Sequence, residues 1–415
     1  MTERQPLSLF EGYGIELEYM VVDRESLEVR PIVDRVLAQA GAGEELEVSL
    51  GEVAISNELA LHVLEFKTDG PSPALAGLGA TFQRYLAKVQ PWLAEHGAQL
   101  LPTGMHPWMN PATDFQLWPH GDRTIYEAFD RLFGCKGHGW SNLQSMHVNL
   151  PFRDDEEFGR LHAAVRLLLP LLPGLAASSP FMEGAYTGLF DTRLSVYWNN
   201  ARPVPSISGQ VVPEAVFTRA DYEQVILDRI YRDMAPLDPD GVLRHEWVNA
   251  RGCIARFERM ALEIRVLDVQ ECPAADLAIA AAVVSVLKAM VEERWSSTAS
   301  QQAFSTEHLA ALLQTTLRQA EQSVIDDGPL LAAFGFPRSG PVRLGELWQH
   351  LVAETLTQDP NYEEWRGPLQ VILQQGCLAR RVAQAVGPTP TPEGLLRTYR
   401  ALAECLQQGI SFQGC

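Results

Sequence analysis

The sequence predicts an α+β protein with a mainly antiparallel sheet and a helical C-terminal part. Two observations lead to this fold class. In about the first two-thirds of the 415 residues, segments that alternate apolar and polar residues are mixed with helical segments, without the regular strand–helix alternation of βαβ units. From Pro273 to the end, the pattern is almost entirely helical, with breaks near 326–343 and 386–392.

The individual elements follow in chain order from periodicity and stop signals. Residues 12–70 predict strands and turns, interrupted by a helix over 31–41 that begins at Pro31, because proline is favoured in a first helical turn. Further helices are expected over 73–97, 123–134, 155–179 and 219–234, further strands over 98–107, 145–152 and 261–270, and loops over 180–215. Pro170 and Pro173 should perturb the helix that contains them.

Composition excludes several function classes. The net charge of −19 argues against nucleic acids and anionic membranes as partners, because phosphate-rich surfaces attract basic proteins. The six cysteines are scattered without a CxxC pair, so neither a zinc knuckle nor a disulfide framework is indicated. The N-terminus lacks a signal-peptide pattern, and the apolar run 277–290 is too short for a membrane span and contains Lys288, so we expect a cytoplasmic protein.

The segment GIELEYMVVD places two glutamates in an otherwise apolar strand. Glu16 and Glu18 alternate with Ile15, Leu17 and Tyr19, so they project from one face, roughly 6.6–7 Å apart, while the other face packs on a core. Taken alone, this pattern is also typical of the solvated face of an antiparallel sheet. The solvated-face interpretation weakens if other strands bring more carboxylates to the same side.

Three further segments supply such residues. On their polar sides they carry Glu65 in LHVLEFKT, His147 in SMHVNL, and Glu263 with Arg265 in ALEIRVLD. Glu58 lies seven residues before Glu65, an odd spacing that an unbroken strand would place on opposite faces. Either a bulge intervenes or Glu58 precedes the strand.

Clustered carboxylates would repel one another unless cations lie between them. Oxygen-rich clusters suit Mg²⁺, and one histidine among them adds tolerance for Mn²⁺. Magnesium held by carboxylates and completed by substrate phosphates is the arrangement of ATP sites, which do not require a Walker loop. The sequence contains no GxxxxGK[ST], GxGxxG or HExxH motif.

Two arginines are candidates for phosphate contact. Arg265 shares a face with Glu263 and could stabilise a transferring phosphoryl group with its rigid fork, although a salt bridge to Glu263 explains it equally well. Arg193, in an aromatic loop region, is a candidate of the same kind, with a structural arginine as the alternative.

Three weaker signals have ordinary structural explanations. The glycine-rich stretch 134–142 could close over a ligand, but a flexible turn is favoured. Cys135 has no catalytic-triad pattern to support it as a nucleophile. His106 is interpreted as an ordinary loop histidine.

Taken in order, these segments resemble the glutamate–cysteine ligase family, and more broadly the carboxylate–amine ligases of glutamine-synthetase-like fold. The resemblance covers roughly residues 10–275 and rests on GIELEYMVVD, SNELALHVLEFKT, SMHVNLPF, SSPFMEGAYTGLFDTR and ALEIRVLDVQ. It implies a curved antiparallel sheet that forms a funnel backed by helices, with ATP and metal ions inside. It also implies two or three magnesium ions held by Glu16, Glu18, Glu58, Glu65, His147 and Glu263.

The resemblance further implies a reaction. ATP phosphorylates a carboxylate, usually that of glutamate, and an amine, usually that of cysteine, attacks the acyl phosphate to form an amide. This is γ-glutamylcysteine synthesis, the chemistry of glutathione biosynthesis, with amino-acid substrates as partners. Arg265 and Arg193 would hold the phosphoryl group, and Glu16, Glu18 and Arg265 would contact the nucleotide.

Two segments depart from the family pattern, namely CKGHGWSNLQSMH before His147 and HEWVNARGCIARFERM before the Glu263 strand. They leave the acceptor amine, and the donor, undecided. The alternatives are an amino-acid or guanidino kinase on the same sheet, a non-catalytic nucleotide-binding regulatory protein, and a metal-dependent hydrolase. We expect a catalytic core over 1–275 and a helical region over 276–415, which either closes the funnel or forms a homodimer interface.

Overall fold

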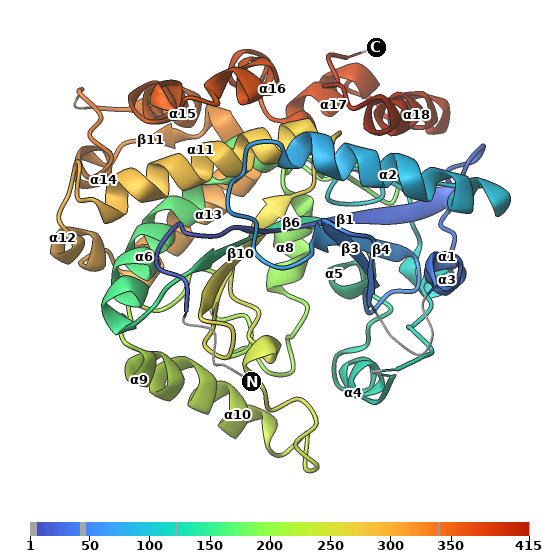
Figure 1. The fold of residues 1–415 in the computed structure, drawn as a ribbon, viewed down its shortest axis with the longest axis horizontal. Coiled ribbons are helices and arrows are strands. Elements are labelled where there is room, and N and C mark those ends of the chain that lie inside the picture. Colours follow the sequence, from blue (N-terminus) through green and yellow to red (C-terminus); the bar gives the residue numbers. More distant parts are fainter. Residues whose placement is uncertain (1–5, 42–46, 122, 339, 415) are drawn as a thin grey trace.

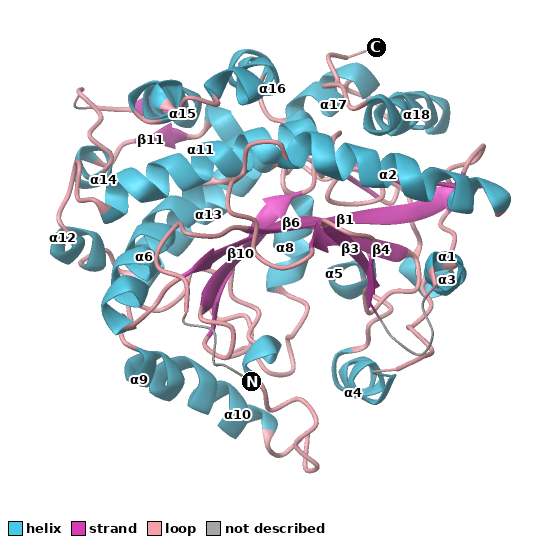
Figure 2. Ribbon diagram, viewed as in Figure 1, coloured by secondary structure: helices cyan, strands magenta, loops and turns pink. Residues whose placement is uncertain are grey.

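The computed structural model describes residues 6–41, 47–121, 123–338 and 340–414. Among them, an eight-stranded sheet has the order β2-β3-β4-β1-β6-β10-β9, with β5 also paired to β1 (Figure 1). Every pairing in this sheet is antiparallel, which confirms the predicted fold class. Figure 2 shows the sheet turning from β1, which lies across the view, to β10, which runs steeply down it.

The strands have the following bounds. In the main sheet they are β1 (Gly14–Asp23), β2 (Glu47–Ser49), β3 (Val53–Asn57), β4 (Val63–Thr68), β5 (Ala98–Leu101), β6 (Ser145–Pro151), β9 (Cys253–Arg256) and β10 (Ala261–Asp268). Two small hairpins consist of β7 (Phe181–Met182) with β8 (Ala185–Tyr186), and β11 (Val324–Ile325) with β12 (Val342–Arg343).

The helices frame this sheet. In the first two-thirds they are α1 (Val33–Ala40), α2 (Leu78–Glu95), α3 (Pro111–Asp114), α4 (Arg123–Phe133), α5 (His138–Ser141), α6 (Asp155–Leu168), α7 (Pro173–Ala176), α8 (Thr192–Trp198), α9 (Arg219–Tyr222) and α10 (Asp228–Met234). The later ones are α11 (Pro273–Val291), α12 (Thr298–Gln302), α13 (Thr306–Gln319), α14 (Gly328–Ala333), α15 (Leu344–Glu354), α16 (Tyr362–Gln375), α17 (Leu378–Val386) and α18 (Pro392–Gln408).

Local chemistry explains where the elements differ from the predicted ones. The helix expected over 155–179 is divided, because Pro170 lies in a 3₁₀ turn after α6 and Pro173 begins α7. A π-helical turn at Glu223–Leu227 separates α9 from α10. The region 180–215, expected to be loops, contains helix α8, whose N-cap Asp191 accepts a hydrogen bond from the Leu194 amide over 2.9 Å.

The two faces of the sheet have opposite character. The apolar side chains of β1, β4, β6 and β10 pack with α2, α6 and α11 in the main hydrophobic core. Figure 1 shows α15 and α16 outside α11, on the side of the sheet away from α4, α9 and α10. The apolar alternation of the strands therefore sets which face is left for polar residues.

Helix α11 is longer than the apolar run 277–290 suggested. It has 19 residues and a mean hydropathy of 2.0, so by length and composition alone it could cross a membrane, and the expectation that this segment is too short was wrong. In the fold, 83% of its most apolar window is buried, and the helix contacts α2, α6 and α16. Burial in the core accounts for its composition.

The C-terminal end is fastened by one buried ion pair. Arg381 of α17 and Glu271, just before α11, are both buried, and Arg381 Nη1 lies 2.7 Å from Glu271 Oε1. The amide of Phe412 donates to the same carboxylate over 3.1 Å, and its carbonyl accepts from Arg381. The division into 1–275 and 276–415 stays a prediction, and residues of both parts share the main core.

We predict that Arg381→Met lowers the free energy of unfolding by about 3–5 kcal/mol, because it leaves the Glu271 carboxylate buried without its partner. Urea unfolding of the wild type and the variant measures the loss, provided that the two proteins have the same m-value. Arg338→Met, which removes an exposed pair with Glu346, is the control and should change stability by less than about 0.5 kcal/mol. Equal effects of the two substitutions would contradict the stabilising role of the buried Arg381–Glu271 ion pair.

Candidate active site

The polar faces of four neighbouring strands form one surface. Their register pairs Glu18 with Glu65, Glu16 with His147, and Glu263 with Asn149. Residues directly opposite in an antiparallel pair share a face, so the separate polar faces seen in the sequence merge into a single carboxylate-rich patch. The solvated-face interpretation of Glu16 and Glu18 is therefore wrong, because Glu18, Glu65 and Glu263 are buried.

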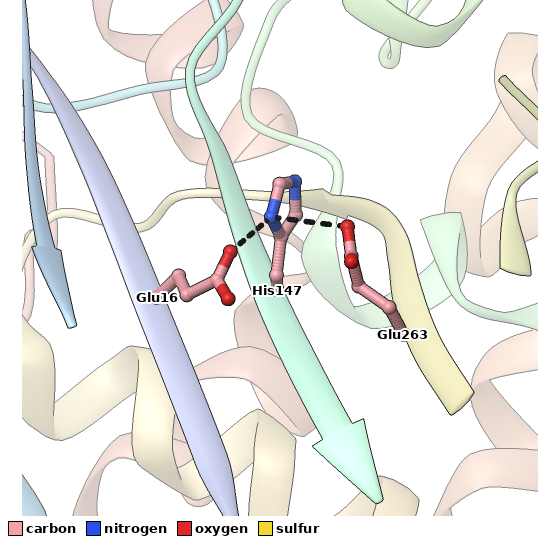
Figure 3. A group of neighbouring side chains, drawn as sticks. All are labelled: Glu16, His147 and Glu263. Carbon is pink, nitrogen blue, oxygen red and sulfur yellow. Dashed lines mark hydrogen bonds and ion pairs between the residues drawn. The ribbon is translucent and has the colours of Figure 1, made fainter. Parts of the chain in front are cut away.

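Glu16, His147 and Glu263 form the centre of this patch. Figure 3 shows the three side chains converging from β1, β6 and β10. His147 Nδ1 lies 2.7 Å from Glu16 Oε2 and 3.8 Å from Glu263 Oε1. One ligand atom from each residue lies within 4.8 Å of the other two. We call these three residues the metal-ligand group.

The second nitrogen of His147 connects to another glutamate. Nε2 donates to Ser145 Oγ over 2.9 Å, and that hydroxyl donates to Glu18 Oε2 over 2.9 Å. Burial alone would lower the pKa of His147, but the hydrogen bond to Glu16 and the charges of Glu18, Glu16 and Glu263 raise it to about 9. In the absence of a metal ion, a proton on Nδ1 thus neutralises charge within the metal-ligand group.

Two more glutamates lie along the same face. Glu58 follows the end of β3, and a turn separates it from Glu65 in β4, which confirms that Glu58 precedes that strand. Burial, with the charges of Glu18 and Glu65, holds the pKa of Glu58 well above its ordinary value. Burial and the charge of Glu16 raise the pKa of Glu65 to about 7. A cation bound beside Glu58 and Glu65 would lower their pKa values and stabilise the ionised carboxylates.

A β-bulge shapes the position of Arg265. The register of β10 against β6 shifts between Ile264 and Leu267, so one extra residue is inserted and Arg265 and Val266 together oppose His147. Arg265 Nη2 lies 3.0 Å from Glu263 Oε1, so the salt bridge considered as the alternative to phosphate contact is present. The same side chain lines the adjacent cavity, so it pairs with Glu263 and also faces the site.

Sequence reasoning missed two neighbouring cations. Lys67 Nζ lies 3.1 Å from Glu65 Oε2, and Arg256 Nη1 lies 3.1 Å from Glu263 Oε2. Lys67 follows Glu65 by two residues in a strand, so alternation alone could have found it. Arg256 comes from β9, and only the strand order brings it beside Glu263.

Arg193 is held deeper than the other candidates. It is buried on α8, where its Nε donates to Asp268 of β10, an acid absent from the predicted site. The side chain still lines the cavity that contains Glu58, His147 and Arg265. The structure therefore gives Arg193 a structural partner and also places it at the site.

Two hollows flank the metal-ligand group. The aromatic hollow, with a volume of about 250 Å³, is lined by Glu18, Glu58, Leu59, Ala60, Val63, Tyr126, Phe129, Gly139, Trp140, Leu143, Ser145, His147, Arg193, Tyr197, Asn200, Trp247 and Arg265. The second hollow, of about 380 Å³, is lined by Leu7, Gly12, Gly14, Glu16, Glu47, Lys67, Thr68, Gly70, Pro71, Asn149, Pro151, Arg259, Met260 and Ala261. We call it the basic hollow after Lys67 and Arg259, which share it with two glutamates, and unlike the aromatic hollow it has no aromatic side chain among its described lining residues.

The donor set fits a hard divalent cation. Oxygen ligands with one imidazole suit Mg²⁺ and Mn²⁺. Burial first, and then neighbouring carboxylates, raise the pKa values of Glu58 and Glu65, so a cation bound beside them would stabilise their ionised forms. Although burial favours protonation of Glu16, the hydrogen bond from His147 and the charges of His147, Lys67 and Arg265 lower its pKa to about 2. Glu16 is therefore anionic throughout the neutral pH range.

The weaker candidates have structural roles. Cys135 is buried, and burial with the nearby Asp130 raises the pKa of its thiol, so it is not an activated nucleophile. The stretch 134–142 contains helix α5 rather than only a flexible turn, and Gly139 and Trp140 line the aromatic hollow. Cys415 lies outside the described residues.

His106 is a buried structural histidine in a loop, in agreement with its interpretation as an ordinary loop residue. Its Nε2 donates to the Leu27 carbonyl over 2.8 Å, and its Nδ1 accepts from the Trp108 amide over 3.3 Å. Burial lowers its pKa to about 4, with the nearby His62 adding to the effect. It is therefore neutral in the folded protein.

Comparisons with known proteins agree on a ligase family. A sequence model of glutamate–cysteine ligase family 2 matches residues 13–388. An uncharacterized protein of Archaeoglobus fulgidus is 39% identical over 280 residues, which are 68% of this chain and 75% of that protein. A Rubrobacter xylanophilus protein with the provisional name glutamate–cysteine ligase 2-3 is 29% identical over 184 residues, which are 44% of this chain and 47% of that protein. The chain thus spans about half the length of most of the relatives that carry this ligase name.

Solved structures share the fold. A glutamate–cysteine ligase from Francisella tularensis in complex with AMP aligns over 97% of this chain and 89% of that chain, with a TM-score of 0.54 and 13% identity. A bifunctional glutathione synthetase from Pasteurella multocida aligns over 95% of this chain and 52% of that chain, with a TM-score of 0.55 and 14% identity. At these identities the likeness concerns the fold, and it supports the predicted architecture.

We predict that the protein binds Mn²⁺ and that Glu263→Gln weakens this binding by at least about 10-fold, because one anionic ligand is lost from the metal-ligand group. Electron paramagnetic resonance of free Mn²⁺ measures the affinity. Glu127→Gln, on the exposed face of α4, is the control and should leave it unchanged. Wild-type affinity in Glu263→Gln would remove this residue from the proposed ligand set.

We also predict a specific acid sensitivity from His106. The unfolded chain protonates this histidine below about pH 6.5, whereas the folded protein does so only near pH 4, so stability is lost as the pH falls through this window. Between these two pKa values, its contribution to the free energy of unfolding should decline by about 1.4 kcal/mol for each pH unit. Urea unfolding at pH 7, 6 and 5 should show a smaller pH dependence for His106→Gln than for the wild type. Parallel profiles would contradict a neutral, buried His106.

Proposed function

The chain belongs to glutamate–cysteine ligase family 2, and from this premise we propose that it uses ATP and magnesium to join a carboxylate to an amine through an acyl phosphate. The donor we propose is glutamate, and the acceptor is cysteine or another amine. The observation that carries this proposal is the metal-ligand group, Glu16, His147 and Glu263, with Arg265 beside it. We extend the proposal to a cytoplasmic enzyme whose partners are small molecules.

The carboxylates supply the cation sites in this proposal. Glu16, His147 and Glu263 would hold one ion, and Glu18, Glu58 and Glu65 extend the ligand set along the same face. Bound magnesium would offset the repulsion between ATP and the substrate carboxylate. Manganese is the alternative ion, since His147 adds a nitrogen ligand.

We assign the nucleotide and the donor carboxylate to different hollows. Lys67 and Arg259 line the basic hollow together with the backbone of Gly12 and Gly14, so we assign the nucleotide phosphates to this side. Arg193 and Arg265 line the aromatic hollow beside the carboxylates, so we assign the donor carboxylate to that side. The γ-phosphoryl group would then meet the donor next to Glu16 and Arg265.

The chemistry follows from this placement. A donor carboxylate oxygen attacks the γ-phosphorus, the bond to the β-phosphate oxygen breaks, and ADP leaves. The guanidinium of Arg265, held by Glu263, stabilises the charge on the transferring phosphoryl group. The amine nitrogen then attacks the acyl carbon, loses a proton, and inorganic phosphate leaves as the amide forms. The residues mainly position the reactants and balance their charges.

We predict that the purified protein releases phosphate from Mg²⁺–ATP only when glutamate and an amine are both present, with a product mass equal to their sum minus water. Arg265→Lys should lower kcat by about 10²–10³-fold, because lysine cannot provide the two-point contact to the phosphoryl group. Arg338→Lys, at an exposed site, is the matched control.

Three results would contradict the proposal. A stable phosphorylated product without an amide would indicate a kinase on the same sheet. Turnover without nucleotide would indicate a hydrolase. Failure to bind Mg²⁺–ATP would remove the nucleotide from the proposal altogether.

A further inference from the structure

The aromatic hollow has a charged floor and an uncharged rim. Its floor contains the buried His147 and Arg193, together with Arg265 and the carboxylates of Glu18 and Glu58. Its rim is formed by large apolar side chains, namely Tyr126, Phe129, Leu143, Trp140 and Trp247. An amine acceptor that attacks an acyl phosphate on the floor must place its substituent against this rim.

The rings of the rim are mutually supported. The ring centroids of Phe129 lie 5.1 Å from those of Trp140 and 5.8 Å from those of Trp247, and Phe133 stacks on Trp140 at 5.6 Å. Trp140 Nε1 donates to the Asn200 carbonyl over 3.0 Å, which fixes the ring to the end of α8. The rim is therefore a preformed aromatic surface rather than a set of loose side chains.

Close packing also fixes the segment that carries Trp140. A Cβ at Gly139 would lie 2.7 Å from the Val196 carbonyl oxygen, so only glycine lets α5 approach α8 this closely. The glycine-rich stretch thus serves to seat a tryptophan at the hollow. Trp247 is placed similarly, with its ring stacked on His245 at 5.5 Å.

The two tryptophans reach the hollow from separate parts of the chain. Trp140 belongs to CKGHGWSNLQSMH and Trp247 to HEWVNARGCIARFERM. Both line the same hollow, and the ring of each lies near that of Phe129. The aromatic surface is therefore built by the tertiary fold rather than by one segment.

The charges around the hollow restrict the acceptor further. Among the described lining residues, the cationic side chains other than His147 are Arg193 and Arg265, and both lie at the floor, on the side assigned to the donor carboxylate. The rim offers no cation for a carboxylate beside the amine. A cysteine would leave most of the aromatic surface without a partner.

We propose that the acceptor is a primary amine that carries an aromatic or large apolar group, which packs between Trp140, Trp247 and Phe129. This inference rests on the proposed ligase function and specifies its acceptor. Stacking on preformed rings gives such an amine affinity that a small acceptor cannot obtain. The amine then reaches the acyl carbon from the rim, opposite the basic hollow.

The test measures amide formation from glutamate and Mg²⁺–ATP with 2-phenylethylamine, phenylalanine and cysteine as acceptors. We expect kcat/KM for 2-phenylethylamine to exceed that for cysteine by at least about 10-fold, with phenylalanine no better than the amine without a carboxylate. Trp140→Ala and Trp247→Ala should each raise the KM for 2-phenylethylamine by about 10-fold and leave the KM for ATP within twofold. Trp295→Ala, in a separate hollow near α12 and α14, is the matched control.

The outcomes separate this inference from the ligase proposal. Preference for cysteine with normal ADP formation would overturn the inference and leave the ligase proposal standing. A raised KM for ATP in both tryptophan variants would assign the aromatic hollow to the adenine base and would also overturn it. Absence of amide with every acceptor would remove the ligase proposal and the inference with it. The two variants are made separately, and thermal unfolding confirms that each is folded.

Discussion

Mutual repulsion among glutamates on one buried face is the constraint on which the rest of this site depends. Glu16, Glu18, Glu58, Glu65 and Glu263 surround His147, and the local cations Lys67, Arg256 and Arg265 offset only part of their charge. Burial, followed by the charges of neighbouring glutamates, raises the pKa of Glu58 and raises that of Glu65 to about 7. Burying this much negative charge costs free energy unless positive ions share the site, and divalent cations are the ions that we propose there.

The sheet makes this concentration of charge geometrically stable. Ile15, Leu17 and their counterparts on β4, β6 and β10 anchor one face in the core, so the period-two alternation commits the other face to polar residues. A slip of one residue in any strand would bury carboxylates in the core, so the register is strongly specified. The bulge in β10 is the one irregularity at this point, and it sets Arg265 against His147.

The sequence alone predicted the parts of the site that obey local periodicity. Glu16, Glu18, His147, Glu263 and Arg265 lie on the face that strand alternation assigned to them, and the register brings them together. The sequence did not decide whether Glu58 lies before the strand of Glu65 or in the same strand with a bulge, because a spacing of seven residues fits both.

Features that depend on tertiary contacts were not predictable from local periodicity. Arg256 reaches Glu263 because β9 is the neighbour of β10 in the sheet. Asp268 is the partner of Arg193 because α8 packs beside the end of β10, a contact that the sequence pattern does not indicate. The aromatic rim combines α4 and α5, which are neighbours in the chain, with the turn at Trp247, which follows α5 by more than a hundred residues, and no local pattern encodes this contact.

Anomalous diffraction from crystals grown with Mn²⁺ and a non-hydrolysable ATP analogue tests most directly whether divalent cations occupy the carboxylate-rich patch. We expect a peak between Glu16, His147 and Glu263 at coordination distances of about 2.0–2.3 Å, with the nucleotide phosphates on the side of Lys67. The absence of any peak there, with His147 Nδ1 still donating to Glu16, would contradict the proposed cation sites.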